Sequence, residues 1–153
     1  MKIHVLLYIA IIALPGLVAC DKSKDNTTAG LPVPEAPERQ FDPQQLASGE
    51  ALYQSNCANC HGETGQGAAN WTKRGADGRF PPPPLNGSGH TWHHSTEILT
   101  GIIRNGSPDN KASMPAFGER LTDQEIQAVI AWIQSTWQKP VYDAWYEMQH
   151  RGS

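Results

Sequence analysis

Two cysteines and a histidine lie within one five-residue segment, Cys57-Ala58-Asn59-Cys60-His61. Two thiols at this spacing lie on one short turn, from which each can form a thioether to a vinyl group of the same porphyrin. The imidazole that follows directly then lies under the ring centre, where it can bind the iron. The segment therefore predicts covalent attachment of one haem c through Cys57 and Cys60, with His61 as an iron ligand.

Two other uses of a paired-cysteine segment fit the sequence less well. A zinc site needs four ligands, but the one remaining cysteine, Cys20, lies far upstream. A thioredoxin-like pair should follow a strand and open a helix. Here the preceding residues have a helical pattern and a glycine-rich loop follows, so the sequence favours haem attachment.

Composition limits the size of the molecule and its partners. The chain has 153 residues, with 12 Lys and Arg against 15 Asp and Glu, so its formal net charge is −3. This length allows one domain plus extensions, and its modest core would gain apolar bulk from a covalently held haem. There is no block of basic residues, so nucleic acid is not expected as a partner.

The N-terminal residues predict export and lipid attachment. Lys2 precedes an apolar run from Val5 to Leu14, which is too short to span a bilayer but suits a secretory signal. The segment Leu17-Val18-Ala19-Cys20 resembles the lipobox of bacterial lipoproteins, which implies cleavage before Cys20 and acylation of its thiol. An uncleaved anchor, or a simple signal followed by a fortuitous cysteine, is the alternative. Asp21 resembles an inner-membrane retention signal, so we expect the periplasmic side of the inner membrane.

A proline-containing polar segment separates this leader from the rest of the chain. Residues 21–40 carry Pro32, Pro34 and Pro37 and show no apolar period, which predicts a disordered, partly polyproline tether. The predicted organisation is a signal peptide at 1–19, a lipidated cysteine and tether at 20–41, a globular domain at 42–139 and a helical extension at 140–153.

Three segments predict the main helices. The first begins at Asp42-Pro43 and ends near Ser55, and the second covers residues 95–105 and ends at Gly106. The third begins with the capping-box pattern Thr122-Asp123-Gln124-Glu125 and is expected to stop at Pro140. Apolar residues recur at helical spacing in the second and third segments. A short amphipathic extension follows at 142–146, and no convincing strand pattern occurs, so the predicted class is all-α.

The first of these helices contains a glycine that needs an explanation. Leu46, Gly49 and Tyr53 share one helical face. A glycine inside a helix is unfavourable by about 1 kcal/mol, and close approach of another helix would account for it.

Together these features resemble class I cytochromes c over residues 42–138. The resemblance implies an all-α fold of three main helices with long loops around one covalently attached haem. It also implies that His61 is the proximal iron ligand and Met114 the distal one, with the Pro83 carbonyl hydrogen-bonded to His61. The matching features, in chain order, are Gly49 and Tyr53, Cys57 to Gly62, Pro83-Pro84-Leu85, Met114 to Phe117, and Trp132.

Met114 also has chemical grounds as a ligand. A thioether is a soft ligand that favours ferrous iron and raises the reduction potential of a histidine-ligated haem. Met114 precedes Pro115 in a loop, rather than lying in an apolar helical stripe. The alternatives are a packing role, Met148 in the C-terminal extension, or Met1, which would be removed with the signal peptide.

A histidine-rich segment is the one departure from the simplest pattern of this family. His90, His93 and His94 lie within five residues. They can bind copper or supply a sixth iron ligand. The simpler interpretation, which we favour, is a loop that leads into the second helix and lines the haem edge.

The sequence thus predicts a membrane-anchored periplasmic monohaem cytochrome c that carries single electrons between redox partners. It has no reaction of its own to catalyse. Its expected partners are redox proteins, with a membrane respiratory complex or a dehydrogenase among the candidates. A haem enzyme or sensor with an open sixth site, and a copper-handling module built on the three histidines, are the alternatives.

Overall fold

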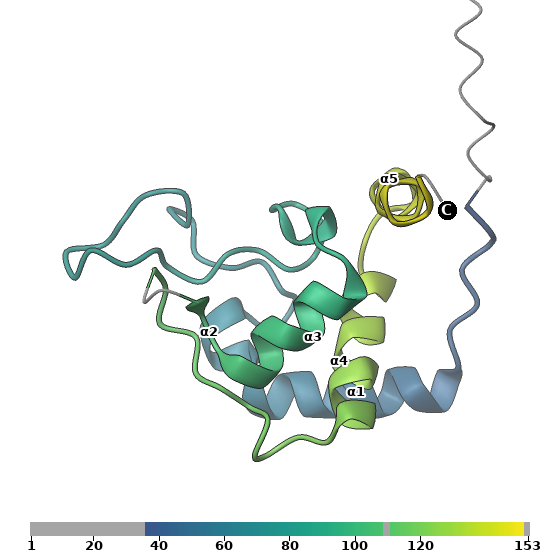
Figure 1. Ribbon diagram of the computed structural model, residues 1–153, viewed down its shortest axis with the longest axis horizontal. Helices are drawn as coiled ribbons and strands as arrows, with labels where there is room; N and C mark the ends of the chain where they lie inside the picture. Colours follow the sequence, from purple (N-terminus) through teal and green to yellow (C-terminus); the bar gives the residue numbers. More distant parts are fainter. Residues whose placement is uncertain (1–35, 109–110, 152–153) are drawn as a thin grey trace, which may run out of the picture. The chain divides into compact units, whose positions relative to one another are not determined.

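The computed structural model describes residues 36–108 and 111–151. The predicted signal peptide, Cys20 and most of the predicted tether therefore lie outside the described residues. Within them no strand forms, and only an isolated parallel bridge joins Phe80 to Ala112. The all-α prediction is confirmed. The elements, labelled in Figure 1, are α1 (Pro43–Asn56), α2 (Ala58–His61), the 3-10 turn η1 (Thr91–His93), α3 (Thr96–Asn105), α4 (Asp123–Ser135) and α5 (Lys139–His150).

Helices α1 and α4 cross at close range and form the centre of the fold (Figure 1). A Cβ atom on Gly49 would overlap the carbonyl oxygen of Ala128 and lie 2.6 Å from its carbonyl carbon. It would also lie 3.0 Å from the Cβ of Trp132. The glycine in α1 is therefore explained by the backbone of α4, as the sequence predicted.

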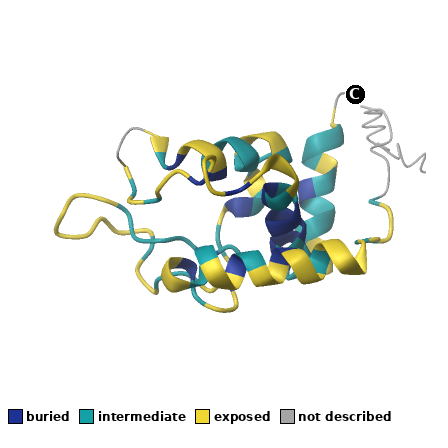
Figure 2. Ribbon diagram, turned by 90° about the horizontal axis from the view of Figure 1, so that it is seen from below, coloured by how far each residue is buried: buried dark blue, intermediate teal, exposed yellow. Residues whose placement is uncertain are grey.

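The core is built mainly from α4, where Figure 2 shows the greatest run of buried residues. Its N-terminus has the predicted capping box, with the Thr122 hydroxyl and the Glu125 carboxylate each satisfying the other residue's backbone N–H. Glu125 has a pKa below its usual value because both the backbone N–H and the hydroxyl of Thr122 donate to its carboxylate. The apolar side chains predicted to face inward are all buried: Ile126, Val129, Ile130 and Ile133.

The end of α4 differs from the prediction. The helix ends at Ser135, with Thr136 as its C-cap, and does not continue to Pro140. Pro140 instead lies in the first turn of α5, where its missing N–H has no helical partner to lose and its fixed φ suits the helix. Helix α5 is also longer than the extension expected at 142–146.

Residues at the end of the predicted tether pack against the domain. The guanidinium of Arg39 donates hydrogen bonds to the carbonyls of Gln134, at 3.3 Å, and Trp137, at 2.6 Å. It also lies 5.1 Å from the ring centre of Tyr142 on α5. A cation is favourable beside the carbonyls at a helix C-terminus. Arg39 therefore contacts the folded unit although it precedes residue 42.

Helix α3 is held against α4 but keeps part of its apolar face uncovered. The Ser95 hydroxyl caps its N-terminus by accepting from the N–H of Ile98, and Gly106 ends it, both as predicted. Of its predicted apolar face only Ile103 is buried, and Ile98 is 50% exposed. Among the described residues, no helix combines the length and apolar character needed to cross a bilayer.

Candidate haem site

One tight turn at the junction of α1 and α2 positions the two cysteines and the histidine. The carbonyl of Cys57 accepts hydrogen bonds from the backbone N–H groups of Cys60, at 3.1 Å, and His61, at 2.9 Å. Neither thiol forms a disulfide. Cys57 is half-buried and Cys60 is exposed, so one thiol faces the interior and the other lies at the surface.

His61 is buried and held in a single tautomer. Its ring Nδ1 lies 2.9 Å from the carbonyl oxygen of Pro83, to which it must donate, since a carbonyl only accepts. Burial lowers the pKa of His61, and the bond to Pro83 opposes this effect only in part. The ring is therefore neutral at pH 7. No described residue pairs with Nε2, which leaves this nitrogen available as an iron ligand.

The surroundings of Cys57 suit an uncharged sulfur. Burial, with a smaller contribution from the neighbouring Cys60, raises the pKa of the Cys57 thiol to about 11. A thiolate is therefore disfavoured here, whereas a thioether carries no charge and fits the same half-buried position. Two free thiols and a neutral imidazole on one turn match the donor set of a covalently attached haem.

Tyr53 connects this turn directly to the α1–α4 core. Its hydroxyl donates a 2.8 Å hydrogen bond to the carbonyl of Gly62, the residue after His61. Its ring lies 4.2 Å from that of Trp132 on α4. Burial raises the Tyr53 pKa, so the hydroxyl stays protonated and able to donate. The hydrogen bond to Gly62 was not predicted, because its acceptor is a backbone atom in a loop.

Met114 lies in a loop that returns against the end of α3. Its carbonyl accepts from the N–H of Ser107, at 3.0 Å, and the N–H of Phe117 donates to Ile103 on α3 at the same distance. The Met114 side chain is half-buried and packs against the hydrophobic core. The competing methionine, Met148, lies on α5. The loop placement of Met114 agrees with the sequence interpretation, while its ligand role stays a prediction.

Several apolar side chains among the described residues keep exposed surface that is available to a cofactor. Leu99, Leu85 and Met114 are only partly buried, although they pack against the core. Together with Ile98 on the same helix as Leu99, they leave apolar area that the described protein atoms do not cover. A porphyrin supplies apolar surface of this kind, so the residues present fit the group.

The three histidines of the 90–94 segment do not converge on one point. His90 stacks on Trp71 with 5.2 Å between ring centres and meets His94 edge-on at 5.6 Å. His93 packs on Trp92 instead, at 3.8 Å. Burial, and then the neighbouring His94 and His93, lower the pKa of His90. In the part of the chain that is described, no group of three or more His, Cys, Asp or Glu has the geometry to hold a metal ion.

Comparison with known proteins decides what this site belongs to. Residues 44–133 match the family described as cytochrome c oxidase, cbb3-type, subunit III. The match covers both main core helices, the Cys57 to His61 turn and the Met114 loop. The chain belongs to this family of cytochromes c. Its cofactor is accordingly a covalently bound haem c, for which Cys57 and Cys60 have the attachment spacing.

Individual relatives agree with this assignment. The chain is 34% identical to cytochrome c6 of Bryopsis maxima, over 58% of its own length and 88% of that protein. It is 33% identical to the cbb3-type cytochrome c oxidase subunit CcoP of Azospirillum sp. (strain B510), over 60% of the chain and 29% of that subunit. It is 32% identical to the cytochrome bc1 complex cytochrome c subunit of Corynebacterium diphtheriae, over 69% of the chain and 32% of that subunit. The chain thus spans about a third of the length of these two respiratory subunits.

A solved structure shares the fold. Cytochrome CL of Methylophaga aminisulfidivorans MPT superimposes with a TM-score of 0.50 at 22% identity, covering 69% of this chain and 62% of that one. The class I cytochrome c fold expected from the sequence is therefore confirmed. The protein is therefore a member of the cytochromes c.

Proposed function

We propose that this cytochrome c carries single electrons between redox partners, with thioethers at Cys57 and Cys60 and with His61 and Met114 as iron ligands. The observation that supports this most is the state of His61. Its ring is buried and neutral, its Nδ1 is bound to Pro83 and its Nε2 has no partner among the described residues, on the turn that carries both thiols.

The residues of the chain then have separate tasks. Bound haem supplies a one-electron ferric/ferrous couple. Pro83 orients the His61 ring, and the Met114 thioether, a soft ligand, favours the ferrous state. With His61 and Met114 as its ligands, the iron would rearrange little on electron transfer and would leave no position open for a substrate. The proposed role is therefore that of a carrier and not of an enzyme or gas sensor.

A substitution at Met114 tests the proposal. Met114→Ala should abolish the weak red to near-infrared absorption band of sulfur-ligated ferric haem, lower the reduction potential and let imidazole or carbon monoxide bind readily. Met148→Ala is the matched control, since Met148 lies on α5 and should leave all three properties unchanged. Absorption spectroscopy and redox titration of the two holoproteins make the comparison.

The two variants separate the candidate functions. If Met148→Ala loses the band while Met114→Ala keeps it, the sixth ligand is misassigned. If the parent protein shows no such band and binds carbon monoxide readily, its sixth position is open and the enzyme or sensor alternative replaces the carrier.

We further propose that Cys20 is acylated and anchors the domain on the periplasmic side of the inner membrane. The lipobox-like segment Leu17 to Cys20, followed by Asp21, supports this anchor. Two of the relatives are named as subunits of a cbb3-type oxidase and a bc1 complex, which supports a membrane respiratory complex as one redox partner. Cys20→Ser should lose incorporation of radiolabelled fatty acid, and unchanged labelling would contradict the anchor.

A further inference from the structure

Four consecutive backbone carbonyls beside His61 each accept a hydrogen bond from a different part of the chain. We call residues 82–85, Pro82-Pro83-Pro84-Leu85, the strap. The four donors, in the order of the carbonyls, are the Ala68 backbone N–H at 2.9 Å, His61 Nδ1 at 2.9 Å, the Thr91 hydroxyl at 3.0 Å and the Trp137 indole N–H at 2.7 Å.

The composition of the strap explains this arrangement. Proline has no N–H, so the backbone of the three prolines can form hydrogen bonds only through its carbonyls. Successive prolines favour the polyproline II conformation, in which each carbonyl points about 120° away from the previous one because there are three residues per turn. No single helix can reach carbonyls that point in different directions. The donors must therefore come from separate elements, as they do.

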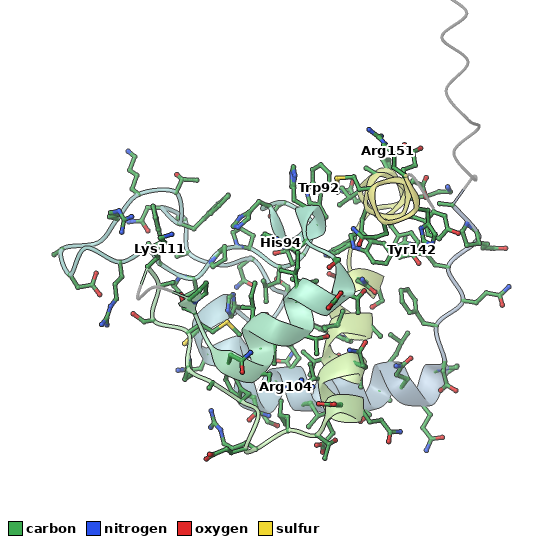
Figure 3. The ribbon with its side chains drawn as sticks, viewed as in Figure 1. Trp92, His94, Arg104, Lys111, Tyr142 and Arg151 are labelled. Carbon is green, nitrogen blue, oxygen red and sulfur yellow. The ribbon has the colours of Figure 1, made fainter. Side chains whose placement is uncertain are left out.

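Thr91 is one of the two side chains, besides His61, that hold the strap. It is 6% exposed and begins η1. Helix α5 packs against η1, and the Trp145 indole on α5 donates a 3.1 Å hydrogen bond to the carbonyl of His94, at the end of η1. Figure 3 shows Trp92 and His94 beside α5. The position of Thr91 thus depends on a helix outside the family match, which ends at residue 133.

Trp137 is the second side chain, besides His61, that holds the strap. It is 2% exposed and lies between α4 and α5. Its own carbonyl accepts from Arg39 at 2.6 Å, and its ring meets that of Trp145 edge-on at 6.1 Å. A Cβ on Gly87, two residues after the strap, would lie 3.3 Å from the Trp137 ring. Contacts on several sides therefore fix the orientation in which this indole donates to the Leu85 carbonyl.

We propose that Thr91 and Trp137 are positioning residues that set the strength of the His61–Pro83 hydrogen bond, and through it the reduction potential. They fix the two carbonyls that directly follow Pro83, at Pro84 and Leu85, while Trp145 keeps η1 in place. This inference rests on the proposed function, since it requires His61 to bind the iron.

The expected direction follows from the chemistry of the ligand. Donation from Nδ1 to a carbonyl makes the imidazole a stronger electron donor, which favours ferric iron. A strap that moves away from His61 weakens this donation. Loss of either anchor should therefore raise the reduction potential, the opposite of the change expected on loss of Met114.

A pair of substitutions at Thr91 tests the inference in the full-length holoprotein. Thr91→Val keeps the size of the side chain and removes the donor, whereas Thr91→Ser keeps the hydroxyl. We expect Thr91→Val to raise the potential and Thr91→Ser to stay close to the parent. The amides of Leu85 and Asn86, which both donate to the Gly65 carbonyl, should exchange with solvent about tenfold faster in Thr91→Val only.

Trp137→Phe tests the second anchor, because it removes the indole N–H and keeps an aromatic ring. It should also raise the potential. The matched control is Trp92→Phe, since the Trp92 indole donates only to Gly89 in its own loop. If Thr91→Val does not yield folded holoprotein, Trp137→Phe and Trp145→Phe decide the question by the same measurements.

The inference is overturned if Thr91→Val and Trp137→Phe fold with the parent's potential and exchange rates, or if Trp92→Phe shifts the potential as much as they do. Failure of the proposed function looks different, because the parent itself would then lack the spectrum of histidine–methionine ligation.

Discussion

The crossing of α1 and α4, through Tyr53, and the strap at residues 82–85 both contact the turn that carries His61, but they are held in different ways. At the crossing, apolar side chains interdigitate around Tyr53 and Ile126, which are both fully buried. In the strap, only Pro84 is buried, and each of the four carbonyls accepts one hydrogen bond. The stabilisation from apolar burial is roughly proportional to the buried area and has no preferred direction. A hydrogen bond, in contrast, weakens strongly when its donor and acceptor move apart by a fraction of an ångström.

The comparison assigns separate physical roles to the two regions. The crossing should account for most of the free energy of unfolding, and the strap for the electronic properties of the His61 ligand. In each region a glycine packs against the backbone of a segment distant in sequence. Gly49 lies against Ala128 at the crossing, and Gly67 lies against the backbone of the strap. Substitution of these glycines tests directly whether stability and the properties of the His61 ligand are controlled by separate regions.

The largest effect is expected for Gly49→Ala. The added Cβ would overlap the Ala128 carbonyl, which is backbone and cannot rotate away, so α1 and α4 must separate. We expect the free energy of unfolding to fall by about 3 kcal/mol or more. Chemical denaturation of the holoprotein measures it. A potential that shifts strongly in the remaining folded protein would show that the crossing also controls the ligand.

Gly67→Ala should have the next largest effect and a different signature. Gly67 has φ +64°, and a Cβ there would lie 2.5 Å from the carbonyl carbon of Pro83. Strain at positive φ and displacement of the strap together should lower the free energy of unfolding by about 2–3 kcal/mol. The reduction potential should rise, because Pro83 is pushed from His61. A variant that loses stability at constant potential would contradict the role of the strap.

Two glycines with empty surroundings provide the smallest expected effects and serve as controls. Gly78 has φ +77° with no atom within 4 Å of a Cβ, so Gly78→Ala should lose only about 1 kcal/mol from backbone strain. Gly101 lies within α3 and is equally open, so Gly101→Ala should gain about 0.5–1 kcal/mol in unfolding free energy. Neither should change the reduction potential.

Local signals in the sequence predicted the helices and the attachment turn. Asp42-Pro43, the Thr122 to Glu125 capping box and Gly106 each act within one helical turn, so residue type alone indicated where helices begin and end. The Cys57 to His61 spacing is likewise local chemistry. Gly49 was interpretable because a glycine inside a helix is unfavourable without close packing. The hydrogen bond of His61 to Pro83 was available only through the family resemblance.

Proline showed the limit of such signals. Pro140 was predicted to end a helix and instead lies in the first turn of the next, because both roles use the same missing N–H and the same fixed φ. Helix α4 ends at Ser135, where no glycine or proline interrupts the helical pattern, so the sequence did not indicate this end.

Contacts between distant segments were decided by the tertiary structure alone. The Trp137 indole meets the Leu85 carbonyl across 52 residues, and Arg39 meets the Trp137 carbonyl across 98. Every residue except proline offers the same backbone N–H and every residue the same carbonyl, so an acceptor of this kind carries no mark in the sequence. A tryptophan can be recognised as a core residue from its side chain, but which carbonyl its N–H reaches depends on where the whole chain places that oxygen.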